Sequence, residues 1–207
     1  MSDQVESLEV EGSGASRRDQ FLIAMYKEMW GNINRHILVV WQSIGLLAGT
    51  FTLFALVGNN AISLDFATTI IVLTTAWVFA HLLDANHWYG RNLAIIVNIE
   101  RQFLTAPDLR LIHPYFKEHR AHSVLDHLAI QAYLSIGVWM TVMVYHFWHR
   151  VLPGIGLPWS TFDPARASPY ATSAISFVLL FRFWKKLQKR HSEFIKNAPG
   201  LPVTPES

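Results

Sequence analysis

The sequence predicts an all-α, polytopic membrane protein with four transmembrane helices, the second of which extends into the cytoplasm. Of its 207 residues, 51% are hydrophobic and 15% are charged, whereas soluble globular domains carry about 25% charged residues. Several stretches of about 20 residues hold no formal charge, and a helix of that length crosses a hydrocarbon layer about 30 Å thick. A third observation, the distribution of Lys and Arg, sets the orientation.

Lys and Arg fall almost entirely on one side of the predicted topology. Four precede the first span, five lie between the second and third, and six follow the fourth, which places 15 of 17 on the same side. Because an excess of Lys and Arg marks cytoplasmic segments, both termini are expected in the cytoplasm, with the protein in the inner (plasma) membrane. Three spans would place the C-terminal basic residues on the opposite side, so this alternation favours four.

The two ends of the chain are predicted to be disordered. Residues 1–18 form an acidic tail with Gly and Ser and without aromatic residues, and such segments bury too little apolar surface to fold. Residues 1–16 contain no Lys or Arg, whereas a cleavable signal peptide begins with basic residues, so we expect the first span to remain as an anchor. Residues 198–207 hold three prolines. Between the tails, residues 19–197 are predicted to form one membrane bundle.

The first span is predicted at residues 37–57, after an amphipathic lead-in helix that begins near Asp19. Apolar residues of the lead-in recur at spacings of three and four, which predicts a helix lying at, or rising into, the membrane surface. Gly45 and Gly49 form a GxxxG pair within the span, and two such glycines let a neighbouring helix approach closely. They predict an association face, although glycines also occur in membrane helices without one.

The second span is predicted at residues 64–84, after a short turn at Gly58, Asn59 and Asn60. Because the turn is so short, the first two spans are expected to form an antiparallel hairpin. No proline interrupts the sequence between the span and Leu104. One helix is therefore expected to leave the bilayer and to continue into the cytoplasm.

The second half of the chain contains two more predicted spans. The cytoplasmic segment, residues 85–125, includes Pro107 and Pro114, which break the helical pattern. The third span is predicted at residues 126–148, and the Pro- and Gly-rich loop after it is expected to lie across the membrane interface without helical structure. The fourth span, residues 169–187, has the shortest uncharged stretch, so its basic side chains must extend toward the lipid headgroups.

A polar stripe is predicted where the second helix leaves the membrane. Its residues fall within an arc of about 100° at 100° per residue. They are His81, Asp84, Trp88, Arg91, Ile95, Asn98 and Gln102. Charges at that depth are costly against lipid, so the stripe is expected to face the bundle or an oligomer axis, with Asp84 and Arg91 paired to other helices as a gate or sensor. The alternative is a helix that gains ordinary interfacial residues.

A histidine-rich segment precedes the third span. His119, His122 and Asp126 are spaced i, i+3 and i+7, so they share one helix face and could present two imidazoles and a carboxylate to a metal ion. Membrane di-iron enzymes repeat such histidine boxes, and no second or third box occurs in this sequence. His146 and His149 form another i, i+3 pair, but the topology places them across the membrane. We therefore expect no metal and keep a metal-dependent membrane enzyme as the alternative.

Sequence motifs of common enzyme classes are missing. There is no GxSxG, no HExxH and no phosphate-binding glycine loop, and the absence of cysteine removes thiolate nucleophiles and thiolate metal sites. No ionisable residue lies near the centre of a predicted span, where a proton-coupled carrier needs one. The sequence thus predicts a protein that is not an enzyme and that needs no cofactor.

Basic residues gather at the end of the fourth span. They are Arg182, Lys185, Lys186, Lys189 and Arg190. Such a group is expected to contact anionic lipids or an acidic cytoplasmic partner, or to be only the basic flank that orients the span. No direct contact with nucleic acid is expected.

Residues 19–104 combine the lead-in helix, the two-span hairpin and the long amphipathic extension, and LLDANHWYGRNLAIIVNIERQF is the part nearest to a signature. This architecture resembles the SLATT-type membrane effectors of bacterial nucleotide-signalling and anti-phage systems, and other small multi-span membrane proteins of bacterial defence. The resemblance implies an inner-membrane oligomer that senses damage or perturbs the bilayer alongside a cytoplasmic partner. The second pair of spans and the lack of a separate sensor domain depart from that pattern.

The favoured function is therefore an oligomeric integral membrane protein that acts as a sensor, a scaffold or a pore-forming effector, in anti-phage defence if the resemblance holds. Two alternatives stay open. One is the metal-dependent membrane enzyme that would use the histidine-rich segment. The other is an anchor that recruits a soluble protein to the basic cytoplasmic surface.

Overall fold

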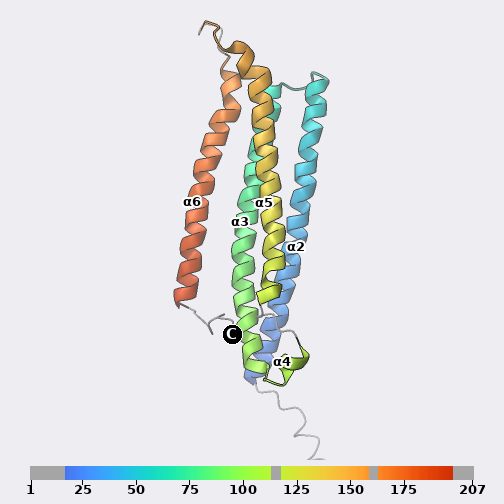
Figure 1. Cartoon of the computed structure of the whole chain (residues 1–207), viewed down its shortest axis with the longest axis vertical. Helices are drawn as coiled ribbons and strands as arrows, with labels where there is room; N and C mark the ends of the chain where they lie inside the picture. Colours follow the sequence, from blue (N-terminus) through green and yellow to red (C-terminus); the bar gives the residue numbers. More distant parts are fainter. Residues whose placement is uncertain (1–16, 113–117, 159–162, 198–207) are drawn as a thin grey trace, which may run out of the picture.

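The computed structural model describes residues 17–112, 118–158 and 163–197. Four long helices run side by side along one axis, and the chain reverses direction between successive helices (Figure 1). Within the described residues there is no β-strand. The all-α class predicted from the sequence is therefore confirmed.

The first two long helices, α2 (Arg17–Gly58) and α3 (Leu64–Phe103), form an antiparallel hairpin of 42 and 40 residues. At 1.5 Å per residue each is about 60 Å long, roughly twice the thickness of a bilayer's hydrocarbon core. Asn60 turns the chain between them at φ 55°, a backbone conformation that Asn tolerates better than most residues. The prediction of a single uninterrupted helix after the turn is confirmed, since α3 runs through Phe103.

Helix α3 occupies the centre of the bundle. It packs against α2, against α5 (Glu118–His146) and against α6 (Ser168–Asn197), and Figure 1 shows it beside α5, with α2 and α6 on either side. Its buried side chains therefore occur on several faces rather than along one stripe. α6, in contrast, lies at the periphery and buries only three of its residues, Pro169, Ser176 and Leu187.

An apolar core joins α2, α3 and α5. Tyr89 is its largest buried side chain, 2% exposed, and the tyrosine hydroxyl donates a hydrogen bond to the carbonyl of Ile33 at 3.3 Å. Buried tyrosines usually find such a partner. The buried members of this core are Ile33, Leu47, Val78, Leu82, Ala85, Tyr89, Leu93, Ile96 and Leu128. Since both helices of the hairpin and α5 contribute residues, this core joins the three helices at the end of the hairpin away from the turn.

Polar contacts attach the first half of α6 to its neighbours. They are Thr69 Oγ1 to Ser168 Oγ at 3.0 Å, Trp139 Nε1 to Ser173 Oγ at 2.9 Å and the Tyr170 hydroxyl to His146 Nδ1 at 3.1 Å. Hydrogen bonds between helices contribute to association where the surroundings are apolar. The start of α6 is thus fixed by specific contacts to both α3 and α5.

Three helices are long and apolar enough to cross a membrane: α2, α3 and the helix that runs from Asp126 to Gly154. α6 is not among them, since its uncharged stretch ends at Arg182. Large apolar side chains such as Trp41 and Phe177 are more than half exposed on the outer surface, where a lipid-facing helix carries them. The fold defines a helical protein with three helices able to span a membrane, and the fourth span stays a prediction.

Short helical turns connect the long helices. α4 (Asp108–Leu111) follows the end of α3, and α5 continues into a π-helical turn, η2 (Phe147–Val151), and a 3-10 turn, η3 (Leu152–Gly154). A further 3-10 turn, η5 (Pro164–Ala167), leads into α6. The loop after the third span was expected to lack helical structure. That expectation was wrong for these turns, because prolines fit the first positions of short helices as well as loops.

The lead-in helix and the first span are one helix. α2 begins at Arg17, so the predicted tail at residues 1–18 is too long by two residues. The physical reason is packing: the Tyr26 hydroxyl donates to the Glu100 carboxylate at 3.1 Å, and Arg18 donates to the Gln102 side chain. These contacts hold the lead-in against α3 instead of leaving it separate on a membrane surface. The remainder of both predicted tails lies outside the described residues.

Candidate functional site: a buried polar cluster at one end of the bundle

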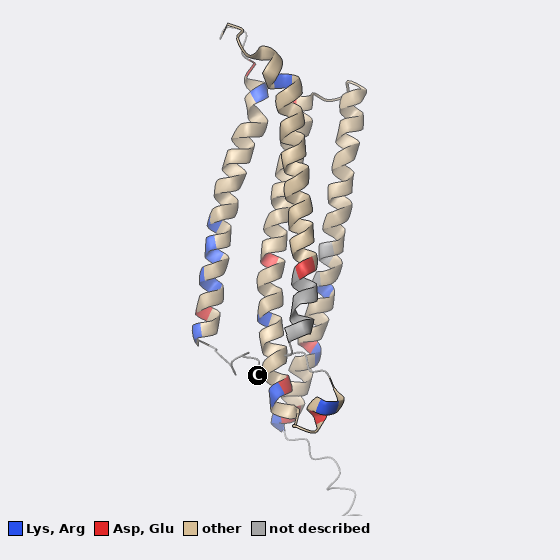
Figure 2. Ribbon diagram, viewed as in Figure 1, with Lys and Arg blue, Asp and Glu red and all other residues tan. Residues whose placement is uncertain are grey.

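Charged residues divide the bundle into separate zones. Figure 2 shows charged residues at one end and in the opposite half of the ribbon, with a charge-free band between them. The charged residues at one end of the bundle come from distant parts of the sequence. They are arranged around one carboxylate, that of Asp65. We call the group the Asp65 cluster, and its members are Asp65, His146, Arg150, Asp163, Arg166 and Tyr170.

Asp65 lies in the first turn of α3 and is only 2% exposed. The turn begins at Ser63, whose hydroxyl accepts a hydrogen bond from the amide of Phe66 at 3.1 Å, as N-cap residues do. A carboxylate is favoured in the first turn because the helix dipole places partial positive charge there. The helix start therefore fixes the Asp65 carboxylate at the end of the bundle, pointing into the space between α3 and α5.

The Asp65 carboxylate accepts three hydrogen bonds from two residues, His146 at the end of α5 and Arg150 in η2. Arg150 donates from Nη2 to Oδ2 at 2.6 Å and from Nε to Oδ1 at 3.0 Å, and His146 Nε2 lies 2.8 Å from Oδ1. Two parallel bonds of this kind give an Arg–carboxylate pair both strength and a fixed geometry. Since an unpaired buried charge is very costly, the pair explains how Asp65 is accommodated.

His146, at the end of α5, links this helix to α3 and to α6. Its side chain is fully buried, and it contacts Asp65 of α3 through Nε2 and the Tyr170 hydroxyl of α6 through Nδ1. Because an ionised carboxylate only accepts, Nε2 carries the proton, and in the neutral imidazole Nδ1 accepts from Tyr170. Arg150 follows His146 by four residues within the π-helical turn η2. Turns of this kind recur where a helix redirects functional side chains.

The outer edge of the cluster is open to solvent. Asp163 is 44% exposed, and its Oδ2 lies 3.5 Å from Arg150 Nη2 and 4.0 Å from Arg166 Nε. Asp163 Oδ1 accepts a 3.0 Å hydrogen bond from the amide of Ala165, which caps η5. The buried side of the cluster is therefore tightly bonded, whereas the contacts of Asp163 with the two guanidinium groups are long.

This geometry favours a structural or responsive role over acid–base catalysis. A catalytic imidazole needs one nitrogen within hydrogen-bond reach of the group whose proton it moves. Both nitrogens of His146 are bonded to protein groups, and the ring has no exposed surface. The cluster can instead couple the positions of α3, α5 and α6, since each helix contributes a hydrogen-bonded side chain.

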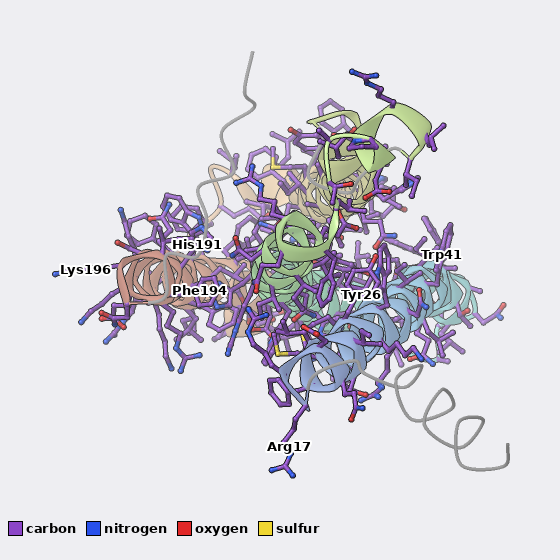
Figure 3. The ribbon with its side chains drawn as sticks, turned by 90° about the horizontal axis from the view of Figure 1, so that it is seen from below. Arg17, Tyr26, Trp41, His191, Phe194 and Lys196 are labelled. Carbon is purple, nitrogen blue, oxygen red and sulfur yellow. The ribbon has the colours of Figure 1, made fainter. Side chains whose placement is uncertain are left out.

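Part of the predicted polar stripe faces α6. The guanidinium of Arg91 lies 5.5 Å from the ring of Trp88 and 5.5 Å from the ring of Phe194, and Figure 3 shows Phe194 on the side of α6 nearest to α3. His81 stacks on Trp77 with ring centroids 5.5 Å apart. Asp84 interacts electrostatically with His87 of the same helix, and among the described residues it forms no ion pair with another helix. The gating role of this stripe stays a prediction.

Gly45 and Gly49 lie on the outer surface of α2 and not against another helix of the chain. A Cβ atom added at either position would meet nothing within 4 Å, and both residues are exposed. Among the described residues, therefore, the GxxxG pair brings no two helices of the chain together. Its open surface is available to a second protein, and self-association stays a prediction.

The basic residues of α6 are exposed and make only weak contacts. Lys189 lies 3.8 Å from Glu193, and the Lys185 ammonium lies 4.9 Å from the ring of Trp184. Arg182, Lys186 and Arg190 are exposed as well. Such positions suit lipid headgroups or an acidic partner equally well, so the structure leaves both predictions open.

The predicted metal ligands cannot be placed. The side chains of His119 and His122 lie outside the described part of the structure, and Asp126 is exposed at the edge of it. In the remaining described residues, no group of three or more His, Asp or Glu side chains could hold a metal ion. The metal-dependent alternative stays untested.

The sequence held one signal for the Asp65 cluster that the prediction did not use. Arg150 and Arg166 are the two basic residues on the side opposite to the other 15. Asp65 and Asp163 lie on that same side of the predicted topology. Exceptions to the positive-inside rule that come with nearby carboxylates indicate ion pairs, but the spacing does not reveal which residues pair.

Comparison with protein-family models, with curated proteins and with solved structures gives no match to this chain. The resemblance to SLATT-type effectors accordingly stays a prediction. What the structure defines is a class: an all-helical protein with three helices able to span a membrane and a buried polar cluster at one end.

Proposed function

We propose that the chain is a four-span integral membrane protein, with both termini in the cytoplasm, that acts as a non-enzymatic sensor or scaffold. One observation carries this proposal. The Asp65 cluster and the zone of basic residues lie at opposite boundaries of a single charge-free band, and α6 shares that band with the other three helices.

The alignment of the helices supports one shared charge-free band, because the charged residues that bound it lie at similar levels on α2, α3 and α5. Asp84 follows Asp65 by 19 residues on α3, which is about 28 Å of helical rise and close to the thickness of a hydrocarbon core. On α5, Asp126 precedes His146, the partner of Asp65, by 20 residues. Asp84 and Asp126 are thus near the same level. Arg35 of α2 lies there too, since the neighbouring Ile33 contacts Tyr89.

Contacts between α6 and α3 likewise show at which level of the bundle the basic residues of α6 begin. Ser168 contacts Thr69 of α3 at one end, and the ring of His191 lies 6.2 Å from that of His87 at the other. Arg182 falls between these contacts, near the level of Asp84. The uncharged part of α6 therefore matches the band of its neighbours, and its basic residues begin where the other helices become charged. This match supports a fourth span despite its short uncharged stretch.

A sensor or scaffold role follows from the continuity of α3. One helix carries Asp65 at the end opposite to the basic residues and Glu100 in the proposed cytoplasmic hairpin. An uninterrupted helix transmits displacement along its axis, so a change in the Asp65 cluster would reach the hairpin. A pore within one chain is not favoured, because α3 fills the centre of the bundle.

Single-cysteine labelling tests this topology. The chain contains no cysteine, so each introduced thiol reports alone. With a membrane-impermeant maleimide on intact cells, we expect labelling of Asn59→Cys and Ile155→Cys, and labelling of Ala106→Cys and Ser192→Cys only after the membrane is permeabilised. Labelling of Ser192→Cys in intact cells would show three spans and contradict the proposal.

Hydrogen exchange tests coupling along α3. In the sensor hypothesis, Asp65→Asn increases amide exchange both around the Asp65 cluster and in residues 89–103 at the far end of the helix. A change confined to the neighbourhood of residue 65 would leave only the scaffold role. Glu193→Gln, which alters an exposed ion pair, is the matched control and should change neither region.

A further inference from the structure

A cavity of about 670 Å³ opens beside the Asp65 cluster, between η2, η3 and the start of α6. The polar side chains along its described walls are Arg150, Arg166 and Tyr170, and no carboxylate side chain is among them. Apolar side chains, including Phe147, Val151 and Leu157, line the remainder. The cavity therefore combines guanidinium groups with an apolar wall, which suits an anion that carries a hydrocarbon portion.

The two guanidinium groups are close enough to bind one anion. Arg150 Nη2 lies 3.5 Å and Arg166 Nε 4.0 Å from the same oxygen of Asp163, so these nitrogens are at most 7.5 Å apart. Arg166 Nε is buried, and no described group accepts a hydrogen bond from it. Arg150 already neutralises Asp65 through Nε and Nη2. Arg166 is thus the cation whose hydrogen-bonding capacity is least satisfied.

Asp163 occupies this position as a weak internal anion. Its carboxylate is half-exposed, and its distances to both guanidinium groups exceed those of a good charge-assisted hydrogen bond. The other carboxylate oxygen is held by the amide of Ala165. A ligand with several acceptor oxygens, such as a phosphate group, can bind both arginines at shorter range than a tethered carboxylate.

We propose that this cavity binds the phosphodiester headgroup of an anionic phospholipid from the leaflet opposite to the cytoplasm. The inference relies on the membrane placement in the proposed function, which puts the cavity at the headgroup level of that leaflet. Arg166 donates to the phosphate, Arg150 contributes through its guanidinium edge, and the apolar wall contacts the glycerol and the first methylenes of the chain. Asp163 competes with the lipid for the same donors.

Two substitutions with opposite expected effects on lipid binding test the proposal, because Asp163 competes with the lipid for Arg166. Native mass spectrometry of the detergent-solubilised full chain would measure binding of phosphatidylglycerol and phosphatidylcholine. We expect one phosphatidylglycerol to bind about tenfold more tightly than phosphatidylcholine. Both lipids carry the same phosphodiester, but the choline ammonium of phosphatidylcholine cancels its charge and is repelled by the two arginines. Arg166→Gln should abolish this preference and Arg166→Lys should restore part of it. Asp163→Asn should strengthen phosphatidylglycerol binding several-fold, because Asn keeps the cap of η5 while it loses the competing charge.

Controls separate this site from other interactions. Lys27→Gln removes an exposed basic residue near the start of α2, at the end of the bundle opposite to the cavity, and it should leave the tight binding unchanged. Equal binding of the two lipids, or no effect of Arg166→Gln in a chain with unchanged circular dichroism, would overturn the proposal. Displacement of the lipid by millimolar inorganic phosphate would also overturn it in favour of a general anion site. Cysteine labelling reports the topology independently, so failure of the membrane placement and failure of lipid binding are distinguishable.

Discussion

Asp65 and Arg150 are 85 residues apart in the sequence, and their side chains form a bidentate ion pair at 2.6 and 3.0 Å. The carboxylate is 3% exposed and the guanidinium 33% exposed. One side of the pair is therefore desolvated while the other retains access to water. This asymmetry makes the pair a contact that fixes helix positions and still responds to what binds at its open side.

Asp65→Asn should destabilise the bundle. The substitution removes the charge that compensates Arg150, and breaking a buried ion pair costs about 3–5 kcal/mol. We expect the lower end of that range, about 3 kcal/mol, because Arg150 can recover hydration at its exposed edge. Equilibrium unfolding in mixed micelles with increasing denaturing detergent measures the loss. The matched control Glu193→Gln breaks an exposed ion pair and should change stability by less than about 1 kcal/mol. Equal effects of both variants would contradict the burial argument.

Replacing Gly45 and Gly49 together by Leu should weaken self-association without harming the fold. A Cβ atom added at either site meets no described atom within 4 Å in the chain itself, whereas a larger side chain there would separate two helices packed through these glycines. Multi-angle light scattering in mild detergent measures the protein mass. Gly137→Leu on α5 is the matched control, because that glycine is also exposed and open. A wild-type chain that is monomeric would contradict the oligomer prediction directly.

Two substitutions of Tyr89 should distinguish the contribution of ring packing to stability from that of the hydroxyl's hydrogen bond. Tyr89→Phe removes only the hydroxyl that donates to Ile33, so we expect a loss of about 1 kcal/mol. Tyr89→Ala also leaves a cavity among α2, α3 and α5, and such truncations cost about 3–5 kcal/mol. The ratio of the two losses is measured by the same unfolding assay. Similar losses for both variants would mean that the ring contributes little packing energy.

Asp108 gives a pH-dependent prediction outside the predicted spans. Its carboxylate accepts hydrogen bonds from the Thr105 hydroxyl at 2.6 Å and from the Thr105 amide at 2.8 Å, and these bonds lower the pKa of Asp108 below its usual value. A lowered folded-state pKa means that the carboxylate stabilises this turn above the unfolded value of about 3.9. That contribution is lost as the pH falls through the folded-state pKa.

Thr105→Val should raise the pKa of Asp108 toward its ordinary value, since it removes the largest of these contacts. Thr105→Ser keeps a hydroxyl and should retain most of the lowering. Carbon-13 NMR of the Asp108 carboxyl group during a pH titration measures the effect. Identical titration in all three proteins would show that the Thr105 side chain does not influence Asp108.

Hydrophobic patterning determined the helices of this protein. The uncharged stretches, the short turn at Asn59 and Asn60 and the uninterrupted run to Leu104 were enough to predict the hairpin of α2 and α3. Local sequence sufficed because helix formation depends on spacing and on nearby breakers, which a single chain displays directly. Even here, the continuity of the lead-in with the first span depended on contacts such as Tyr26 with Glu100, which link residues 74 positions apart.

The Asp65 cluster depended on tertiary structure. The sequence indicated that Asp65, Arg150 and Asp163 share one side of the membrane, but it could not indicate that the first two meet within 3 Å or that His146 bridges α3 and α6. Those contacts form only when α3, α5 and α6 are correctly aligned along the bundle axis. The packing of their apolar faces determines that alignment. Composition and periodicity decide which segments become helices. Only close packing decides which polar groups are brought out of water together, because the cost of burying one charge is met only when its partner lies at bonding distance.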